Sequence, residues 1–131
     1  MKLIDELTDI YLEGVQGEMR YLFDRHTERI LLDAPTSLTG EPEIDMDDEE
    51  YELAVEVPVS TSAEMYQLRA EFTQKQTETN SVGALLAALE GRKPFRQFQE
   101  AAYELGLIED WYTYERTYAE GIMEEWLTDN Q

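Results

Sequence analysis

Cysteine is absent from the chain of 131 residues, and histidine occurs once, at His26. The missing thiols exclude disulfide frameworks, thiolate nucleophiles and cysteine-based zinc sites, and they are typical of a protein in a reducing compartment. A single imidazole has no second histidine or cysteine with which to build a metal site. We therefore expect His26 to be a solvated turn residue, with a proton carrier or ligand as the alternative.

Basic side chains are also scarce, because ten lysines and arginines stand against thirty aspartates and glutamates, for a formal net charge of −20. A field of that sign opposes direct contact with DNA, RNA or anionic lipid. We expect the partner to be another protein, and homo-oligomerisation stays open. The alternative is that the acidic surface imitates nucleic acid and inhibits a DNA-handling protein by occupying its basic groove.

Long apolar runs are missing as well. No stretch approaches the length of a membrane-spanning helix, and Asp5 and Glu6 come too early for a signal peptide. A chain of this length can bury roughly two thirds of its unfolded surface without metals or disulfides. We expect one cytoplasmic domain over residues 1–131, with a flexible acidic loop at 33–50 that lacks any apolar period.

The N-terminal half predicts a helix followed by a small sheet. Apolar residues at helical spacing predict a helix over residues 2–13, which Gly14 ends because glycine tolerates positive φ. Alternating apolar and polar residues on both sides of the polar turn Asp24 to Glu28 predict a hairpin from about Tyr21 to Leu32. Strict alternation from Tyr51 to Val59 predicts a third strand with its odd-numbered residues buried.

The C-terminal half predicts helices. Thr61 followed by Glu64 is a capping-box pattern that opens one of them. Three more apolar stripes at helical spacing lie between Ser81 and Leu127, with breaks at Gly91–Pro94 and at Gly106. The stripes consist of Val82, Leu85, Leu86 and Leu89, of Phe95, Phe98, Ala102 and Leu105, and of Trp111, Tyr114, Tyr118 and Ile122.

These three helices are joined by short turns, so they should pack as neighbours and form the nucleus of the core. The last helix has a wide apolar arc that includes Trp126, and we expect it to face both preceding helices. The predicted fold class is α+β: a small three-stranded antiparallel sheet with an N-terminal helix and a C-terminal layer of three to four helices.

The C-terminal region also carries a resemblance to a known family. The residues that carry it are the run L-x-x-A-L-E-G-R-x-P-F-R-x-F from Leu85 to Phe98, then Leu105-Gly106-Leu107, Glu109-Asp110-Trp111-Tyr112 and Glu125-Trp126-Leu127. With this pattern the chain resembles uncharacterised protein family 0158, a bacterial group, over nearly its whole length. It departs from the family at His26-Thr27, where a glycine is usual, and at Pro94, where a small residue is more common. The resemblance implies a fold pattern but no reaction, substrate or cofactor.

Acidic residues dominate the segment before the third predicted strand. Four of them fall at places 1, 3, 5 and 12 of a calcium-loop register: Asp45, Asp47, Glu49 and Glu56. Glu50 stands where that register requires glycine for its sharp turn, and a strand follows where a helix should. We expect a solvated acidic loop and keep the four residues as metal-site candidates.

Three of the ten basic residues gather at the start of a predicted helix, at Arg92, Lys93 and Arg96. A helix N-terminus favours anions, so this cluster and the nearby Tyr112 and Tyr114 are candidates for binding a partner or an anion. Exposed aromatic residues are typical of interfaces. The favoured alternative is that the bases neutralise the protein's own acids, for example through a pair of Arg96 with Glu100 at i, i+4 spacing.

No recognisable catalytic or cofactor motif accompanies these residues. Glu109 and Asp110 are adjacent on a helix and therefore do not face one another, and the helix dipole explains carboxylates in a first turn. We do not expect an enzyme or a cofactor. The sequence favours a non-enzymatic acidic protein-interaction or regulatory module. An unrecognised hydrolase, the further alternative, would need two converging carboxylates with a perturbed pKa in a pocket.

Overall fold

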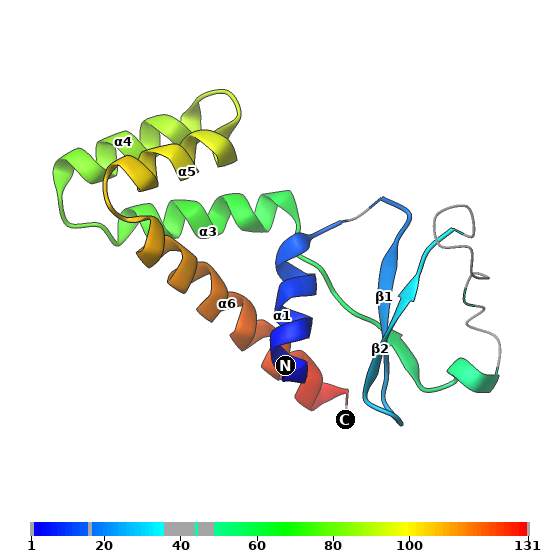
Figure 1. The fold of residues 1–131 in the computed structure, drawn as a ribbon. Coiled ribbons are helices and arrows are strands. Elements are labelled where there is room, and N and C mark those ends of the chain that lie inside the picture. The colour runs from blue at the N-terminus through cyan, green and yellow to red at the C-terminus, as the bar shows by residue number, and fades with distance from the viewer. Residues whose placement is uncertain (1, 16, 36–43, 45–48, 131) are drawn as a thin grey trace. The chain divides into compact units, whose positions relative to one another are not determined.

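The computed structural model describes residues 2–15, 17–35, 44 and 49–130. The elements along the chain are α1 (Leu3–Glu13), β1 (Arg20–Asp24), β2 (Arg29–Asp33), the 3-10 helix η1 (Glu49–Tyr51), β3 (Ala54–Glu56), α3 (Ser62–Gln74), α4 (Thr79–Glu90), α5 (Pro94–Glu104) and α6 (Ile108–Asp129) (Figure 1). The predicted α+β class, with an N-terminal helix, a three-stranded antiparallel sheet and C-terminal helices, is confirmed.

The chain divides into two compact units. We call residues 1–60 with 119–131 the sheet unit, and residues 61–118 the helical unit. The expectation of one domain over residues 1–131 stays a prediction. Most of the acidic loop expected at 33–50 lies outside the described residues, so its flexibility also stays a prediction. Within the described ranges, no helix has both the length and the apolar character that a membrane crossing requires.

The sheet unit is built on the predicted hairpin, which is confirmed. Strands β1 and β2 are antiparallel, with Tyr21 opposite Leu32 and Phe23 opposite Ile30. In the turn, the amide of Glu28 donates a hydrogen bond to the Asp24 carbonyl at 2.7 Å. The predicted exposure of His26 is also confirmed, and its amide donates to the Asp24 carboxylate at 2.9 Å. This hydrogen bond holds the pKa of Asp24 below its ordinary value.

The third strand differs from its prediction. Only Ala54–Glu56 pair with β1, at the edge opposite β2, and Tyr51 belongs to η1 instead of the strand. The expected burial of the odd-numbered residues is wrong at Leu53, which is exposed, whereas Ala54 is buried. The chain is still turning after η1 when it reaches Leu53, so this side chain lies ahead of the paired region and the sheet does not cover it.

Asp33 ends β2 and joins two segments by hydrogen bonds. The Arg20 guanidinium donates to one carboxylate oxygen of Asp33 at 2.7 Å, and the Ile44 amide donates to the other at 3.0 Å. Desolvation alone would raise the pKa of Asp33, but these two donors outweigh it and hold the pKa below its ordinary value. The charged form of this carboxyl is therefore the one that the fold favours.

The core of the sheet unit combines α1, the hairpin and the end of α6. On α1, the residues Leu7, Ile10 and Tyr11 are buried, which confirms the predicted apolar stripe. Gly14 follows with φ 74°, a conformation that suits glycine. The ring of Phe23 meets Trp126 edge to face, with centroids 5.8 Å apart. We predicted that all of the last helix would face the two helices before it; this is wrong for residues 119–131, which belong to the sheet unit.

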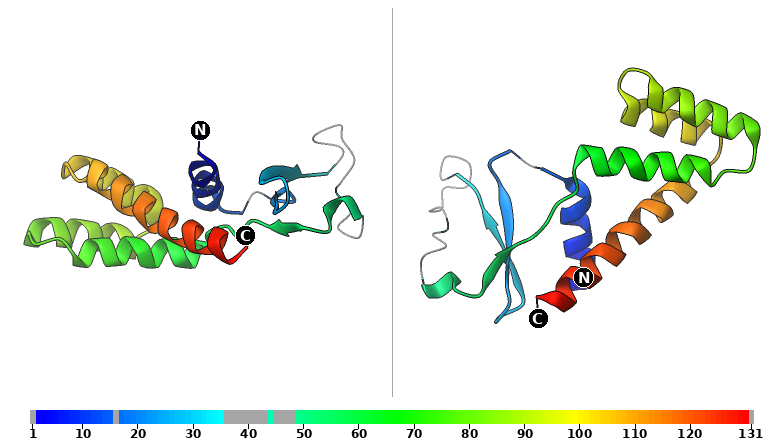
Figure 2. Two further views of the ribbon diagram at one scale, coloured as in Figure 1. Left: turned by 90° about the horizontal axis from the view of Figure 1, so that it is seen from below. Right: turned by 180° about the vertical axis from the view of Figure 1, so that it is seen from behind.

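The helical unit contains α3, α4, α5 and residues 108–118 of α6. Figures 1 and 2 show α4 and α5 running side by side. Aromatic rings form the centre: Phe72 lies 6.1 Å from Phe98 and 5.4 Å from Trp111, while Phe98 and Trp111 are 5.0 Å apart. Phe98 and Trp111 are buried, so the predicted helical nucleus is confirmed for this part of the chain. The Thr61 hydroxyl accepts from the Glu64 amide at 3.1 Å, as the capping pattern predicted.

Candidate functional site

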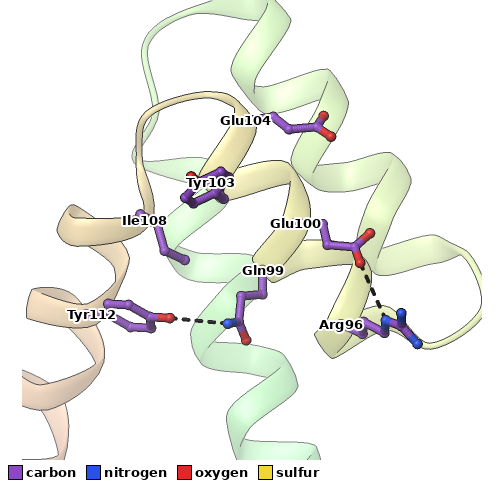
Figure 3. A pocket seen from close by; sticks show the side chains of 7 residues that line it. All are labelled: Arg96, Gln99, Glu100, Tyr103, Glu104, Ile108 and Tyr112. Atoms are coloured by element: carbon purple, nitrogen blue, oxygen red, sulfur yellow. Dashed lines mark hydrogen bonds and ion pairs between the residues drawn. The ribbon is translucent and has the colours of Figure 1, made fainter.

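An open hollow of about 500 Å³ lies on the surface of the helical unit. We call it the α5–α6 groove. Its lining residues are Arg96, Gln99, Glu100, Tyr103, Glu104, Ile108 and Tyr112 (Figure 3). It combines aromatic, aliphatic and charged side chains on two consecutive helices.

Helical spacing brings the α5 residues of the groove together. Positions 96, 99, 100, 103 and 104 repeat every three to four residues and therefore share one face of the helix. The buried residues Phe98 and Ala102 lie between them in sequence and occupy the opposite face. Pro94 opens α5, where its missing amide costs nothing and its fixed φ suits the helix.

A tight turn places the start of α6 beside this face. Gly106 has φ 73°, and the amide of Leu107 donates to the Ala102 carbonyl at 2.8 Å, so the chain reverses within a few residues. Ile108 and Tyr112 lie one turn apart on α6 and line the same hollow as the α5 residues. Figure 3 shows the Tyr112 hydroxyl directed toward Gln99.

Two polar contacts fix side chains in the groove. The amide of Gln99 donates a hydrogen bond to the Tyr112 hydroxyl at 3.2 Å, and Arg96 donates to the Glu100 carboxylate at 3.4 Å (Figure 3). The second contact is the i, i+4 pair that the sequence suggested. Both of its partners are exposed, so the pair is worth only about 0.3–0.5 kcal/mol. An incoming charged group can therefore displace it at little cost.

Two tyrosines of the groove are unusually accessible. Tyr103 is 73% exposed and Tyr112 is 48% exposed, and both are large aromatic side chains. Aromatic residues of this kind are enriched at protein interfaces, where they bury much area with little loss of conformational freedom. Tyr103 was absent from the sequence-based candidates. Its position seven residues after Arg96, on the polar face of α5, is the signal that would have found it.

The other predicted partner residues line different hollows. Arg92 lines a second hollow with residues of α4 and α5, and Lys93 lines a third one together with Pro94 and Arg96. Tyr114 is half-buried in the aromatic core, with its ring 5.4 Å from Phe72, and does not line the groove. The structure thus brings Arg96 together with Tyr112 in the groove and with Lys93 in the third hollow, while the role of the set as a partner or anion site stays a prediction.

The calcium register falls partly outside the described residues, because Asp45 and Asp47 are not among them. Glu49 lies in η1, and Glu56 lies in β3 with its carboxylate 4.0 Å from the Arg20 guanidinium. In the part of the chain that the structure describes, no group of three or more histidine and acidic side chains is placed to hold a metal ion. The four-residue calcium site therefore stays a prediction.

A half-buried ion pair in the helical unit was not predicted. The Arg69 guanidinium lies 3.9 Å from the Glu115 carboxylate, and its carbon atom is 4.2 Å from the centroid of the Phe95 ring and 4.8 Å from that of Trp111. Burial raises the pKa of Glu115 and lowers the pKa of Arg69, although their mutual attraction opposes both changes. Glu115 faces a guanidinium instead of a second carboxylate, so this pair lacks the arrangement that the hydrolase alternative requires.

Comparison with known proteins gives a family. The family model described as "Uncharacterised protein family (UPF0158)" matches residues 2–131. UPF0158 protein PA5073 of Pseudomonas aeruginosa is 31% identical to the chain over 133 aligned positions, which cover 97% of this chain and 81% of that protein. No solved structure matches the chain. The motif from Leu85 to Phe98 thus pointed to the right group, and the chain belongs to the uncharacterised protein family UPF0158.

Proposed function

We propose that this protein is a non-enzymatic, cytoplasmic interaction module that binds another protein through the α5–α6 groove. The observation that carries the proposal is the exposure of Tyr103 and Tyr112 on the two sides of one hollow. A domain of this size gains stability by burying aromatic area, so leaving two large rings in water forgoes part of that gain. A partner that covers the two rings would recover the stabilisation that their burial provides.

The polar groups of the groove suit recognition more than chemistry. The Gln99 amide donates a hydrogen bond to the Tyr112 hydroxyl, so the Tyr112 ring has a defined position before a partner arrives. Preorganised aromatic anchors lower the entropic cost of association. The net charge of −20 adds long-range attraction for a basic surface and repulsion for nucleic acid.

Site-directed photocrosslinking tests this function. We would place benzoylphenylalanine at Tyr103 or Tyr112 and, as a matched control, at the exposed Glu71 on α3. Irradiation in a bacterial lysate should give one adduct of the same mass from both groove positions, and excess unmodified protein should abolish it. The Glu71 variant should not give that adduct. Two results would refute a partner at the groove. One is that all three positions give the same adducts, and the other is that excess unmodified protein abolishes no adduct.

A further inference from the structure

Helix α4 has an outward face that the helical unit leaves uncovered. Its inward face consists of the buried residues Ser81, Leu85 and Leu89. On the outward face, four exposed residues follow one another at intervals of four, three and four positions: Thr79, Gly83, Leu86 and Glu90. Two paired helices of a coiled coil meet along a seam with this spacing, because each helix contributes two positions to every heptad. The outward face of α4 is therefore spaced for a second helix.

The charge of this face suits a second copy of the chain. With a net charge of −20, two copies repel each other wherever their acidic surfaces meet. Residues 79–89 form the longest stretch of the chain without a charged side chain, so a contact through this stretch avoids most of the repulsion. Leu86 is 40% exposed on it, and contact with another apolar surface would remove this side chain from water.

The electrostatics of the two ends of α4 select an antiparallel arrangement. Within the described residues, the N-cap residue Glu78 makes no side-chain hydrogen bond to the first turn, so amides remain free there. At the other end, the carboxylate of Glu90 stands in the last turn, where the helix dipole disfavours negative charge. An antiparallel second α4 would bring Glu90 of one copy to the free amides of the other, where the dipole favours it.

The seam is also self-complementary. Thr79 and Glu90 lie equally far from the midpoint of α4. Gly83 and Leu86 are likewise symmetric about that midpoint, so a two-fold axis there would place Leu86 of one copy opposite Gly83 of the other. A Cβ atom at Gly83 would meet no other atom of the described residues within 4 Å, and the space over this glycine is therefore open to that leucine.

We infer that two copies of this chain form an antiparallel, two-fold symmetric dimer through α4. The helix has 12 residues and is about 18 Å long, so the contact is smaller than that of a permanent dimer. The dimer should accordingly exchange with the monomer at about 10–100 μM protein. The inference goes beyond the proposed function, because the α5–α6 groove lies on other helices. A dimer carries two such grooves, and a partner with two matching segments would bind it more tightly than it binds one groove.

Sedimentation equilibrium of the full chain measures this association. The dimer should strengthen from low to moderate salt, because screening weakens the repulsion between the copies. At moderate salt, Leu86→Glu should raise the Kd of the dimer at least about tenfold, because it puts a charge into the seam. Leu53→Glu is the matched control, since Leu53 is 43% exposed but belongs to the sheet unit, and it should change Kd less than about twofold. Circular dichroism of the dilute variants checks that each keeps its fold.

A second pair of variants separates the helix ends from the overall charge. Glu90→Lys puts a cation at the N-terminus of the other copy's helix and should raise Kd about fivefold. The same substitution should not destabilise the dilute monomer, because a cation suits the C-terminus of its own helix. Glu71→Lys makes the same change of charge at an exposed position of α3, so it weakens repulsion and its Kd should stay the same or fall.

The absence of cysteine allows the orientation to be tested directly. Chains with Thr79→Cys are mixed with chains with Glu90→Cys and treated with a short bismaleimide crosslinker. In the antiparallel dimer these two positions are neighbours, whereas the two copies of either position lie about 16 Å apart along the helices. The mixture should therefore give cross-linked dimers, and each variant alone should give few.

Several results would overturn the inference. A chain that stays monomeric at about 1 mM has no dimer of the expected strength. Equal Kd values for Leu86→Glu and Leu53→Glu would place the contact away from α4, and a lower Kd for Glu90→Lys would contradict the antiparallel ends. Crosslinking of each cysteine variant with itself would show a parallel pair. None of these results would affect the proposed function, because the photocrosslinks at Tyr103 and Tyr112 test the α5–α6 groove separately.

Discussion

Replacing Arg69 with methionine should destabilise the helical unit by about 3 kcal/mol at neutral pH. Methionine keeps the hydrophobic stem but removes the charge, and the side chains of Arg69 and Glu115 are only 13% and 21% exposed. Breaking a fully buried ion pair on one side costs about 3–5 kcal/mol, because the remaining charge is left unpaired, and this half-buried pair sets a smaller loss. Because Glu115 remains partly exposed, the expected loss of stability lies at the lower end of that range. The lost cation–π contacts with Phe95 and Trp111 act in the same direction.

The pH dependence of that loss identifies its cause. With Arg69 gone, burial alone acts on Glu115, so its pKa in the folded protein rises further above the unfolded value. The folded state then binds a proton more tightly than the unfolded state, and stability falls as the pH rises through this window. The defect should therefore be smaller at pH 5 than at pH 8. A cavity left by poor packing would cost the same at both pH values.

Urea unfolding followed by tryptophan fluorescence measures these effects. The chain has two tryptophans, so a Trp126→Phe background leaves Trp111 as the reporter of the helical unit. Arg69→Met combined with Glu115→Leu should return to within about 1 kcal/mol of the starting stability, because no buried charge is left unpaired. The control Arg96→Gln disrupts an exposed pair and should cost less than about 0.5 kcal/mol. Equal losses for Arg69→Met and Arg96→Gln, or a loss independent of pH, would refute the reasoning.

Three further predictions concern other parts of the molecule. Asp33→Asn should lower the free energy of unfolding by about 1 kcal/mol at pH 7, because the Arg20 and Ile44 donors lose a charged acceptor. Since folding lowers the pKa of Asp33, the difference in stability between the two proteins should vanish as the pH falls below that pKa. Urea titrations at several pH values check this. Tyr103→Ala should change the free energy of unfolding by less than about 0.5 kcal/mol, whereas Tyr114→Ala, in the aromatic core, should lower it by about 3 kcal/mol. Scanning calorimetry of both variants measures these changes. The melting temperature should rise from low to moderate salt, because screening weakens the self-repulsion of a net charge of −20, and a flat or falling trend would contradict this.

Local patterns predicted the elements that depend on local physics. The hairpin follows from alternation on both sides of a polar turn. The backbone amides of His26 and Thr27 donate hydrogen bonds to the Asp24 carboxylate, which explains why the turn closes without glycine at His26. Thr61 caps its helix through a contact only three residues away. The third strand was predicted too long because its alternation continues through Tyr51 to Leu53, where η1 and the following turn precede the paired residues. Alternation shows which residues could pair, but the position of β1 decides which of them do.

Features that depend on contacts between residues far apart in the chain could not be predicted from the sequence. Arg69 stands among apolar residues of α3 and looks like an exception to the stripe, and nothing in its neighbourhood indicates that its partner is Glu115, 46 positions later. The division of α6 between two units is similar. Its apolar arc is wide enough for one continuous packing surface, yet Trp126 meets Phe23 of the hairpin while Trp111 meets Phe98 of α5. A stripe predicts that a face is buried but does not identify what buries it.

Only the part of the α5–α6 groove that depends on local helical spacing could be predicted from the sequence. Arg96 with Glu100 and the exposure of one tyrosine follow from helical spacing, but the approach of Tyr112 to Gln99 depends on the reversal at Gly106. Tyr103 is the informative residue, because it lies on the polar face of α5 opposite Phe98 and has little contact with the rest of the helical unit. A side chain that contributes so little to folding is free to be replaced by any polar residue as far as stability is concerned. The partner contact proposed for the α5–α6 groove rests on the exposure of this ring together with that of Tyr112.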